Sequence, residues 1–312
     1  DNFIQMTNHP TNNPTENNNH DNCIENNNII LTWTNKKCNN YNQYVRQKLF
    51  NKKNLDHYEV GEILLFNDFY RYALETPGQI EPIQVQDPEQ KSKAVKVPDV
   101  ENEKKTFVSF YTSEQVKLID IEKIKYKLTP IKFKVNTVLT PELNDKFRKN
   151  MELINQFINV DLDIYILQVQ RISEIKDGIE PTTHTIYTIH PSSERKFNEI
   201  GEQFEESVVK LRKSCYKLIE QMKSDNMVKS DLQAEVDKKL NKLFKDWQLN
   251  VIDKFAQLNY GYSITVHKSQ GSTFKNVFVD ISDILENNNI DETSKCLYTA
   301  ITRSSNSLEL LI

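Results

Sequence analysis

Residues 261–274 read GYSITVHKSQGSTF. The β-branched start predicts a short buried strand, and the polar residues after it predict a loop at the carboxyl end of that strand. Open α/β sheets bind ligands at this end, where hydroxyls and free backbone N–H groups suit phosphate oxygens. His267 can stack on a base or donate to a phosphate, and Gly271 permits close approach of the backbone. On these residues alone, an ordinary polar loop remains the alternative.

A second stretch, residues 297–304, reads LYTAITRS and is predicted to end a helix. Arg303 near a helix C-terminus is explained equally by a solvated cation that complements the helix dipole. The functional interpretation is an arginine finger, a guanidinium that neutralises charge on a transferring phosphoryl group.

Together the two stretches resemble superfamily 1 helicases of the RecD-like and Dda-like branch. The resemblance rests on YSITVHKSQGS at 262–272, which matches the motif called V, and on YTAITRS at 298–304, which matches motif VI. A weaker similarity covers IILTWTNKK at 29–37, typical of a strand and helix in the second RecA-like domain. Residues 60–62 resemble the strand that precedes the inserted domain of this family.

The resemblance implies a role for individual residues. Contacts to the phosphates or bases of single-stranded DNA are expected from Asn35, Thr265, His267 and Lys268. Coupling of the DNA side to the nucleotide side is expected from Gln270, Gly271 and Ser272, with Arg303 reaching the γ-phosphate as the catalytic residue. Thr273 stands where the family often has a glutamate that contacts ribose.

The chain carries no phosphate cradle of its own. None of its six glycines lies five residues from another, so the P-loop pattern G-x-x-x-x-G-K-[ST] is absent. Residues 291–292 (Asp-Glu) follow a polar Asn run rather than an apolar strand, which excludes a Walker B assignment. We therefore expect ATP and Mg²⁺ to be bound mainly by a first RecA-like domain of the same polypeptide, and this chain to be inactive alone.

The predicted fold is α/β, with a RecA-like parallel-sheet domain interrupted by an insertion. Residues 1–28 are rich in asparagine and are expected to be a disordered lead-in. Residues 29–66 and 250–312 are assigned to the RecA-like domain, and 67–249 to the insertion. Besides the strands that begin at 29 and end near 266, apolar runs predict strands over 277–281 and 308–312 of this domain. Within the insertion, 67–190 reads as β-rich, for which the resemblance implies an SH3-like barrel. This part includes an expected strand over 131–138 and an expected Pro-, Lys- and Glu-rich loop over 75–105. Apolar spacing over 193–249 predicts a helical hairpin.

The chain of 312 residues has a net charge of −4, so nucleic-acid binding must come from local patches. Residues 36–53 hold six basic side chains and no acid, and 117–134 hold six lysines against two acids. Both runs are also explained as solvated faces. The scattered four cysteines indicate a reducing, intracellular setting, and His20 with Cys23 lacks the second pair of ligands that a zinc site needs.

The sequence thus predicts the C-terminal motor part of an ATP-dependent DNA helicase, with a role in DNA replication or repair. Its expected partners are single-stranded DNA or a forked duplex, the first RecA-like domain, and replication or repair proteins, with no membrane. The expected location is the nucleus or cytoplasm, or a viral factory if the source is viral. The alternative is a non-catalytic, helicase-like nucleic-acid-binding or scaffold subunit.

Overall fold

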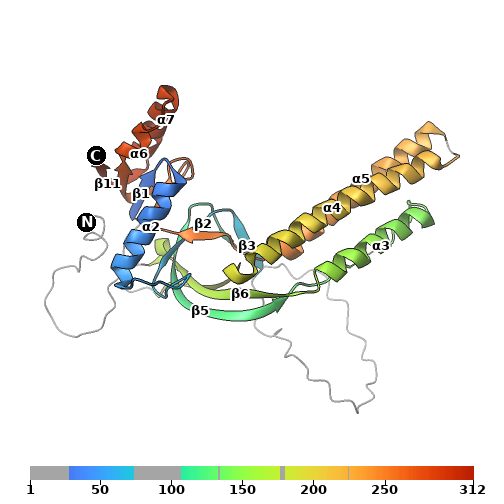
Figure 1. Ribbon diagram of the computed structural model, residues 1–312, viewed down its shortest axis with the longest axis horizontal. Helices are drawn as coiled ribbons and strands as arrows, with labels where there is room; N and C mark the ends of the chain where they lie inside the picture. The colour runs from blue at the N-terminus through green and yellow to red at the C-terminus, as the bar shows by residue number, and fades with distance from the viewer. Residues whose placement is uncertain (1–27, 74–106, 133, 176–179, 224) are drawn as a thin grey trace, which may run out of the picture.

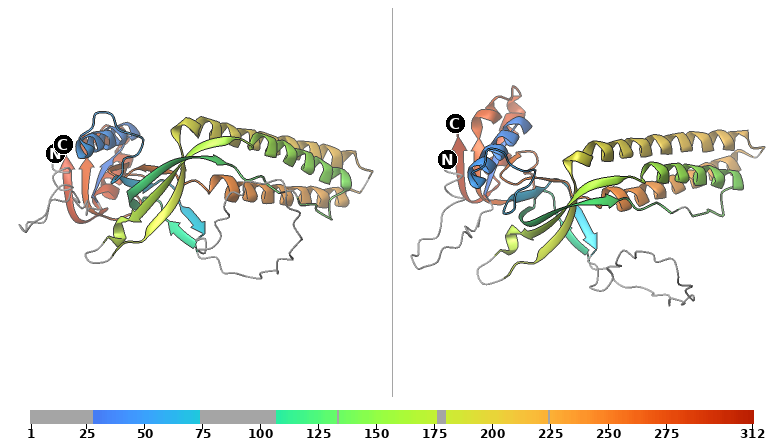
Figure 2. Two further views of the ribbon diagram at one scale, coloured as in Figure 1. Left: turned by 90° about the horizontal axis from the view of Figure 1, so that it is seen from below. Right: turned by 60° about the horizontal axis from the view of Figure 1, so that its bottom comes forward.

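The computed structural model describes residues 28–73, 107–132, 134–175, 180–223 and 225–312. Apart from Asn28, the predicted lead-in falls outside these residues, as does a Pro- and Lys-rich loop that we expected over 75–105. A parallel sheet with its helices lies at one end of the long axis and three long helices lie at the other (Figure 1). An antiparallel sheet with two long, curved strands connects them (Figure 2).

The parallel sheet has four strands in the order β11-β10-β1-β9. They are β1 (Asn28–Thr32), β9 (Ser263–Thr265), β10 (Phe274–Asp280) and β11 (Ser304–Leu311). Every neighbouring pair is parallel, so the four carboxyl ends share one edge of the sheet. The sequence predicted the strands that correspond to all four, and the parallel sheet confirms the α/β fold class.

Helices cover both faces of this sheet. Helix α2 (Asn35–Phe50) buries Val45 against Ile30 and Phe278 on one face. Helices α6 (Ile281–Leu285) and α7 (Ile290–Ile301) pack on the other face, where Ile29 and Leu31 point. Alternation along β1 sends successive side chains to opposite faces, which is why a continuous apolar strand is needed here.

The insertion holds a five-stranded antiparallel sheet in the order β7-β6-β5-β2-β8. Its strands are β2 (Ile63–Phe66), β5 (Gln115–Lys127), β6 (Asp161–Arg171), β7 (Thr183–Ile189) and β8 (Leu258–Tyr260). A separate ribbon pairs β3 (Tyr70–Ala73) with β4 (Phe107–Phe110). The SH3-like form of the insertion stays a prediction.

Sheet pairing does not follow the predicted domain boundaries at 66 and 250. We placed residues 63–66 and 258–260 in the parallel-sheet domain, yet β2 pairs with β5 of the inserted sheet and β8 pairs with β2 at the edge of that sheet. The chain therefore leaves and re-enters the parallel-sheet unit through two adjacent antiparallel strands. Such pairing joins segments about 200 residues apart, which local sequence patterns do not reveal.

One expected strand is wrong. Residues 131–138 form no strand among the described residues, of which 133 is not one. Side chains of the following helix, α3 (Pro141–Phe157), take over backbone hydrogen bonds there: Asn155 Oδ1 accepts from the Ile131 amide at 2.9 Å, and Asn144 Oδ1 from the Asn136 amide at 3.0 Å. Amide side chains that bond to the backbone compete with sheet formation.

The predicted helical hairpin is present as α4 (Pro191–Gln221) and α5 (Asn226–Trp247). A π-helical turn over Gln248–Ile252 and a 3₁₀ turn over Ile172–Glu174 complete the helical segments. Helix α3 packs alongside α4, so the unit has three helices rather than two (Figure 2). Its core includes the stacked rings of Phe204 and Trp247, 4.0 Å apart. None of the helices described is long and apolar enough to cross a membrane.

Candidate functional site

The carboxyl edge of the parallel sheet brings together the residues predicted to contact DNA. Thr265 at the end of β9 lies in register with Thr32 at the end of β1, and the Val266 amide donates to the Thr32 carbonyl at 2.8 Å. His267 and Lys268 follow directly and are exposed. Thr265 itself is only 7% exposed, so it offers little of its surface to a ligand in this conformation.

Asn35 reaches the same edge as the first residue of α2. Thr34 caps this helix by accepting from the Lys37 amide at 3.2 Å, which leaves Asn35 exposed in the first turn. The cap is anchored by Asp283, a fully buried side chain of α6. Its carboxylate accepts from the Trp33 amide (2.6 Å), the Thr34 amide (2.9 Å) and the Thr34 hydroxyl (2.8 Å).

Sequence reasoning missed Asp283. Its sequence signal is local: an acidic residue in the first turn of a short helix that follows a buried strand. In the structure Asp280 caps this helix, because its side chain accepts from the Asp283 amide at 3.0 Å. That signal predicts a helix start and gives no hint of the contact to Thr34, which is 249 residues away. Asp283 is a positioning residue, because it holds the loop that presents Asn35.

Residues 266–272 form a compact turn. Ser269 is fully buried, its hydroxyl donates to the Val266 carbonyl at 2.7 Å, and its amide points to the Thr265 and Val266 carbonyls. Gly271 has φ +85°, a conformation that L side chains rarely adopt. The turn therefore exposes Lys268 and Gln270 on either side of a rigid serine.

Arg303 lies against the end of this turn. Its guanidinium donates from Nη1 to the Ser272 carbonyl at 3.1 Å and from Nε to the Thr299 carbonyl at 3.0 Å. A third N–H, on Nη2, donates to the Thr302 hydroxyl at 2.9 Å. An arginine has five N–H donors, so two of them have no partner among the described residues and stay available for a ligand.

The two groups of predicted residues lie at opposite edges of the sheet. Thr265 ends β9 at the carboxyl edge, whereas Arg303 precedes Ser304, which is in register with Phe274 at the amino end of β10. The turn 266–272 runs between these edges. The predicted DNA-contacting residues and the predicted arginine finger are thus connected through one short turn, residues 266–272.

A pocket of about 550 Å³ lies between this turn and α7. His267 and Gln270 line it from the turn, and Glu292, Tyr298 and Thr299 line it from the helix. The His267 Nε2 atom is 3.8 Å from a Glu292 carboxylate oxygen. Residues from both motif-like stretches, 261–274 and 297–304, therefore line one cavity.

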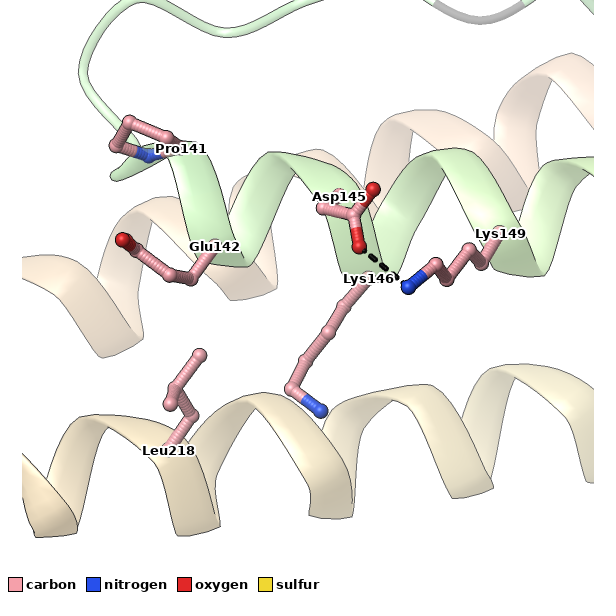
Figure 3. Close-up of a pocket in the computed structure, with 6 residues that line it drawn as sticks. All are labelled: Pro141, Glu142, Asp145, Lys146, Lys149 and Leu218. Carbon is pink, nitrogen blue, oxygen red and sulfur yellow. Dashed lines mark ion pairs between the residues drawn. The ribbon is translucent and has the colours of Figure 1, made fainter.

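A second pocket, of about 500 Å³, lies between α3 and α4 in the helical unit (Figure 3). Its charged side chains are ordinary helix surface pairs, such as Asp145 with Lys149 at 2.7 Å. No group in it is buried or convergent enough to indicate chemistry.

The basic run 36–53 does not form one surface. Arg46 is 2% exposed and pairs through Nε with Glu62, which is fully buried. Its Nη2 donates to the carbonyls of Asp56 (2.8 Å) and His57 (3.1 Å), and its guanidinium lies 3.8 Å from the centre of the Tyr260 ring. Burial raises the pKa of the Glu62 carboxyl to about 7, although the paired guanidinium acts in the opposite direction. Arg46 is therefore structural and unavailable to a phosphate backbone.

The positive charge of the lysines in 117–134 is partly compensated by acidic side chains of the neighbouring strand. On β5, Lys125 and Lys127 stand in register with Asp163 and Asp161 of β6, and Lys123 forms an ion pair with Asp163 at 3.1 Å. These lysines alternate along the strand and so share one face with the acids. This arrangement favours a solvated face over a phosphate-tracking surface.

The residues present fit only part of an ATP–Mg²⁺ site. Arg303 can offer guanidinium donors to a phosphate. In the part of the chain that the structure describes, however, no group of three or more His, Cys, Asp or Glu side chains could hold a metal ion. Mg²⁺ requires oxygen ligands, usually carboxylates and phosphates, which this edge does not gather.

Among the comparisons with known proteins, a family model matches the C-terminal segment. Residues 260–311 match the UvrD-like helicase C-terminal domain. This match supports the coarser prediction, the C-terminal part of a superfamily 1 helicase, and does not single out the RecD-like and Dda-like branch.

The uncharacterized protein R530 of Acanthamoeba polyphaga mimivirus is 31% identical over 289 residues, covering 91% of this chain and 47% of that protein. The chain thus spans about half the length of this curated relative. A crystal structure of the Pif1 helicase from Candida albicans aligns with 99% of this chain and 48% of its own, at 11% identity and a TM-score of 0.28. A score of this size is too low to transfer either fold or function.

Proposed function

We propose that this chain is the C-terminal motor portion of an ATP-dependent DNA helicase of the RecD-like and Dda-like branch. In this proposal it couples nucleotide hydrolysis to translocation along single-stranded DNA and to duplex unwinding, in the 5′ to 3′ direction. The observation that carries it is the contact between Arg303 and the Ser272 carbonyl, 3.1 Å, which joins the two motif-like stretches. The match of residues 260–311 to the UvrD-like helicase C-terminal domain supports the helicase part of this proposal.

In the proposed enzyme the carboxyl edge binds the strand. Asn35, His267 and Lys268 are exposed there and supply an amide, an imidazole and an ammonium group for phosphates or bases. Thr265 needs a small opening of the edge to contribute its hydroxyl. A strand bound at this edge contacts the turn 266–272, and Arg303 donates to Ser272 at the other end of that turn. A shift of the turn would therefore move groups at both sites.

Arg303 is the proposed catalytic residue. Its present partners are two carbonyls and a hydroxyl, all neutral, and charge-assisted hydrogen bonds to phosphate are roughly twice as strong. Exchange of these partners when a second lobe approaches is therefore favourable. ATP and Mg²⁺ would supply the phosphoryl group and its charge neutralisation, held mainly by a first RecA-like domain of the same polypeptide.

The test of this role uses a polypeptide that carries both lobes. Arg303→Ala should lower DNA-stimulated ATP turnover by about 10³-fold or more, the scale of arginine fingers in related phosphoryl transfer, while ATP binding changes little. Arg303→Lys keeps the charge and loses the fork-shaped donor set, so turnover should recover only in part. Unchanged turnover in Arg303→Ala would exclude the catalytic role.

The second candidate is a non-catalytic nucleic-acid-binding or scaffold subunit. It is favoured by one observation, the lack of a P-loop pattern in these 312 residues. Sequence adjoining residue 1 in the intact protein distinguishes the two candidates: a G-x-x-x-x-G-K-[ST] stretch followed by a strand that ends in Asp-Glu supports the motor. A polypeptide without them that binds single-stranded DNA would support the scaffold.

Partners and location follow from the proposed activity. A helicase of this kind acts on single strands or forked duplexes and works with replication or repair proteins. The relative in a giant virus of Acanthamoeba agrees with action in a viral factory. Fluorescence imaging of the tagged protein during infection, with the viral DNA stained, would test this location.

A further inference from the structure

Two exposed aromatic side chains stand next to the carboxyl edge. Phe69 is 56% exposed and Tyr111 is 64% exposed, and their rings meet edge to face with centroids 5.8 Å apart. They belong to two loops of the insertion, one between β2 and β3 and one between β4 and β5. Leaving two large rings in water is unfavourable, so a pair that is held in this way is a candidate for ligand contact.

The loops beneath the pair are firmly held. The Ser113 amide donates to the Phe66 carbonyl at 2.8 Å, and Phe66 stacks on Phe110 in the core with ring centroids 4.5 Å apart. Glu114 accepts from the Tyr111 amide at 2.8 Å and forms an ion pair with Arg171 at 2.5 Å. Tyr111 is thus fixed by its backbone, while its ring stays free of cover.

The same loops contact the turn of the candidate site. The Ser113 hydroxyl donates to the Lys268 carbonyl at 2.7 Å. The Lys268 ammonium in turn lies 3.4 Å from the Asn67 side-chain oxygen. Because β9 is the edge strand of the parallel sheet, the two aromatic loops continue the carboxyl edge beyond Lys268.

We propose that Phe69 and Tyr111 form a stacking platform for unpaired bases of a single nucleic-acid strand that leaves the carboxyl edge past Lys268. The inference rests on the proposed function and extends it to residues outside both motif-like stretches. Asp68, exposed beside Phe69, disfavours phosphate at this point and so favours the base faces as the contact. Stacking on aromatic side chains tolerates every base, which suits a protein that moves along a strand.

The experiment titrates the 312-residue chain into a labelled oligothymidylate and into a labelled abasic strand of equal length. Fluorescence anisotropy measures the binding of each. The wild type should bind the oligothymidylate about tenfold more tightly, since stacking needs bases. Phe69→Ala with Tyr111→Ala should remove this preference and leave abasic binding unchanged. Phe69→Tyr and Tyr111→Phe keep the rings and should keep the preference.

A matched control is Phe244→Ala, a 41% exposed aromatic on α5 in the remote helical unit, which should change neither affinity. Circular dichroism melts establish that each variant is folded. If both strands bind with a salt-dependent affinity and the double alanine variant still prefers bases, the platform is wrong while the proposed function stands. If neither strand binds to the wild type, the proposed function fails and the platform fails with it.

Discussion

The carboxyl edge of the parallel sheet and the junction between the two sheets use similar side chains in opposite ways. At the edge, Asn35, His267 and Lys268 are left in water. At the junction, Arg46 and Glu62 are buried together, with the guanidinium also bonded to two carbonyls. Residue type therefore does not separate a candidate binding group from a structural one; what separates them here is whether the fold buries the side chain.

The largest expected effect is at the junction. Arg46→Met removes the guanidinium and leaves the Glu62 carboxyl buried without its partner, a loss of about 3–5 kcal/mol in the free energy of unfolding. Urea unfolding measures it. The loss should be smaller at pH 5 than at pH 8, because a buried carboxyl with a raised pKa is protonated at the lower pH and needs no counterion.

Two further variants complete this test. Lys36→Met, an exposed position on the same helix, should stay within about 0.5 kcal/mol of the wild type. Arg46→Met with Glu62→Leu removes both charges and should recover much of the stability lost by the single variant. A single variant as stable as Lys36→Met would show that the buried pair contributes nothing.

The next largest effect is expected at Asp283, the buried side chain that holds the loop presenting Asn35. Asp283→Ala removes three hydrogen bonds to Trp33 and Thr34 and should cost about 2–3 kcal/mol, since bonds to a charged acceptor are among the stronger ones. Amide hydrogen exchange at Trp33 and Thr34 should speed up by more than the global change.

Asp291→Ala is the matched control for Asp283→Ala. This aspartate is exposed in the first turn of α7, where its expected contribution is below about 1 kcal/mol. Unaltered exchange at Trp33 and Thr34 in Asp283→Ala would show that the loop presenting Asn35 is held by other contacts.

The comparison also shows where sequence patterns suffice. Residues 261–274 and 297–304 predicted a strand, a polar turn and a helix end, because these depend on neighbours within a few positions. The burial of Arg46 depends on Tyr260, which is brought close only by the pairing of β2 with β8. Asp283 and the aromatic pair likewise depend on contacts across more than 40 residues. Long-range pairing therefore decides which polar groups are covered, and short-range patterns do not contain it.

The smallest expected effect tests a buried titratable group of the inserted sheet. His184 is 7% exposed, its Nδ1 atom is 3.0 Å from the Tyr72 hydroxyl, and its Nε2 has no partner among the described residues. Burial lowers the pKa of His184 below the ordinary value of 6.5, and the Arg171 charge adds to this. As the pH falls below about 6.5, the unfolded chain takes up a proton that the folded chain resists, so stability should decline.

His184→Gln removes this titration and should flatten the profile of melting temperature between about pH 7 and pH 5 by a few degrees, the scale of about 1 kcal/mol in a chain of this size. Tyr72→Phe keeps the imidazole and deletes its hydrogen bond, so it should lower the melting temperature at every pH and leave the slope in place. If His184→Gln retains the wild-type slope, the pH sensitivity comes from other groups. A flattened slope in His184→Gln, with the slope retained in Tyr72→Phe, would show that burial makes this imidazole a pH-dependent part of the core.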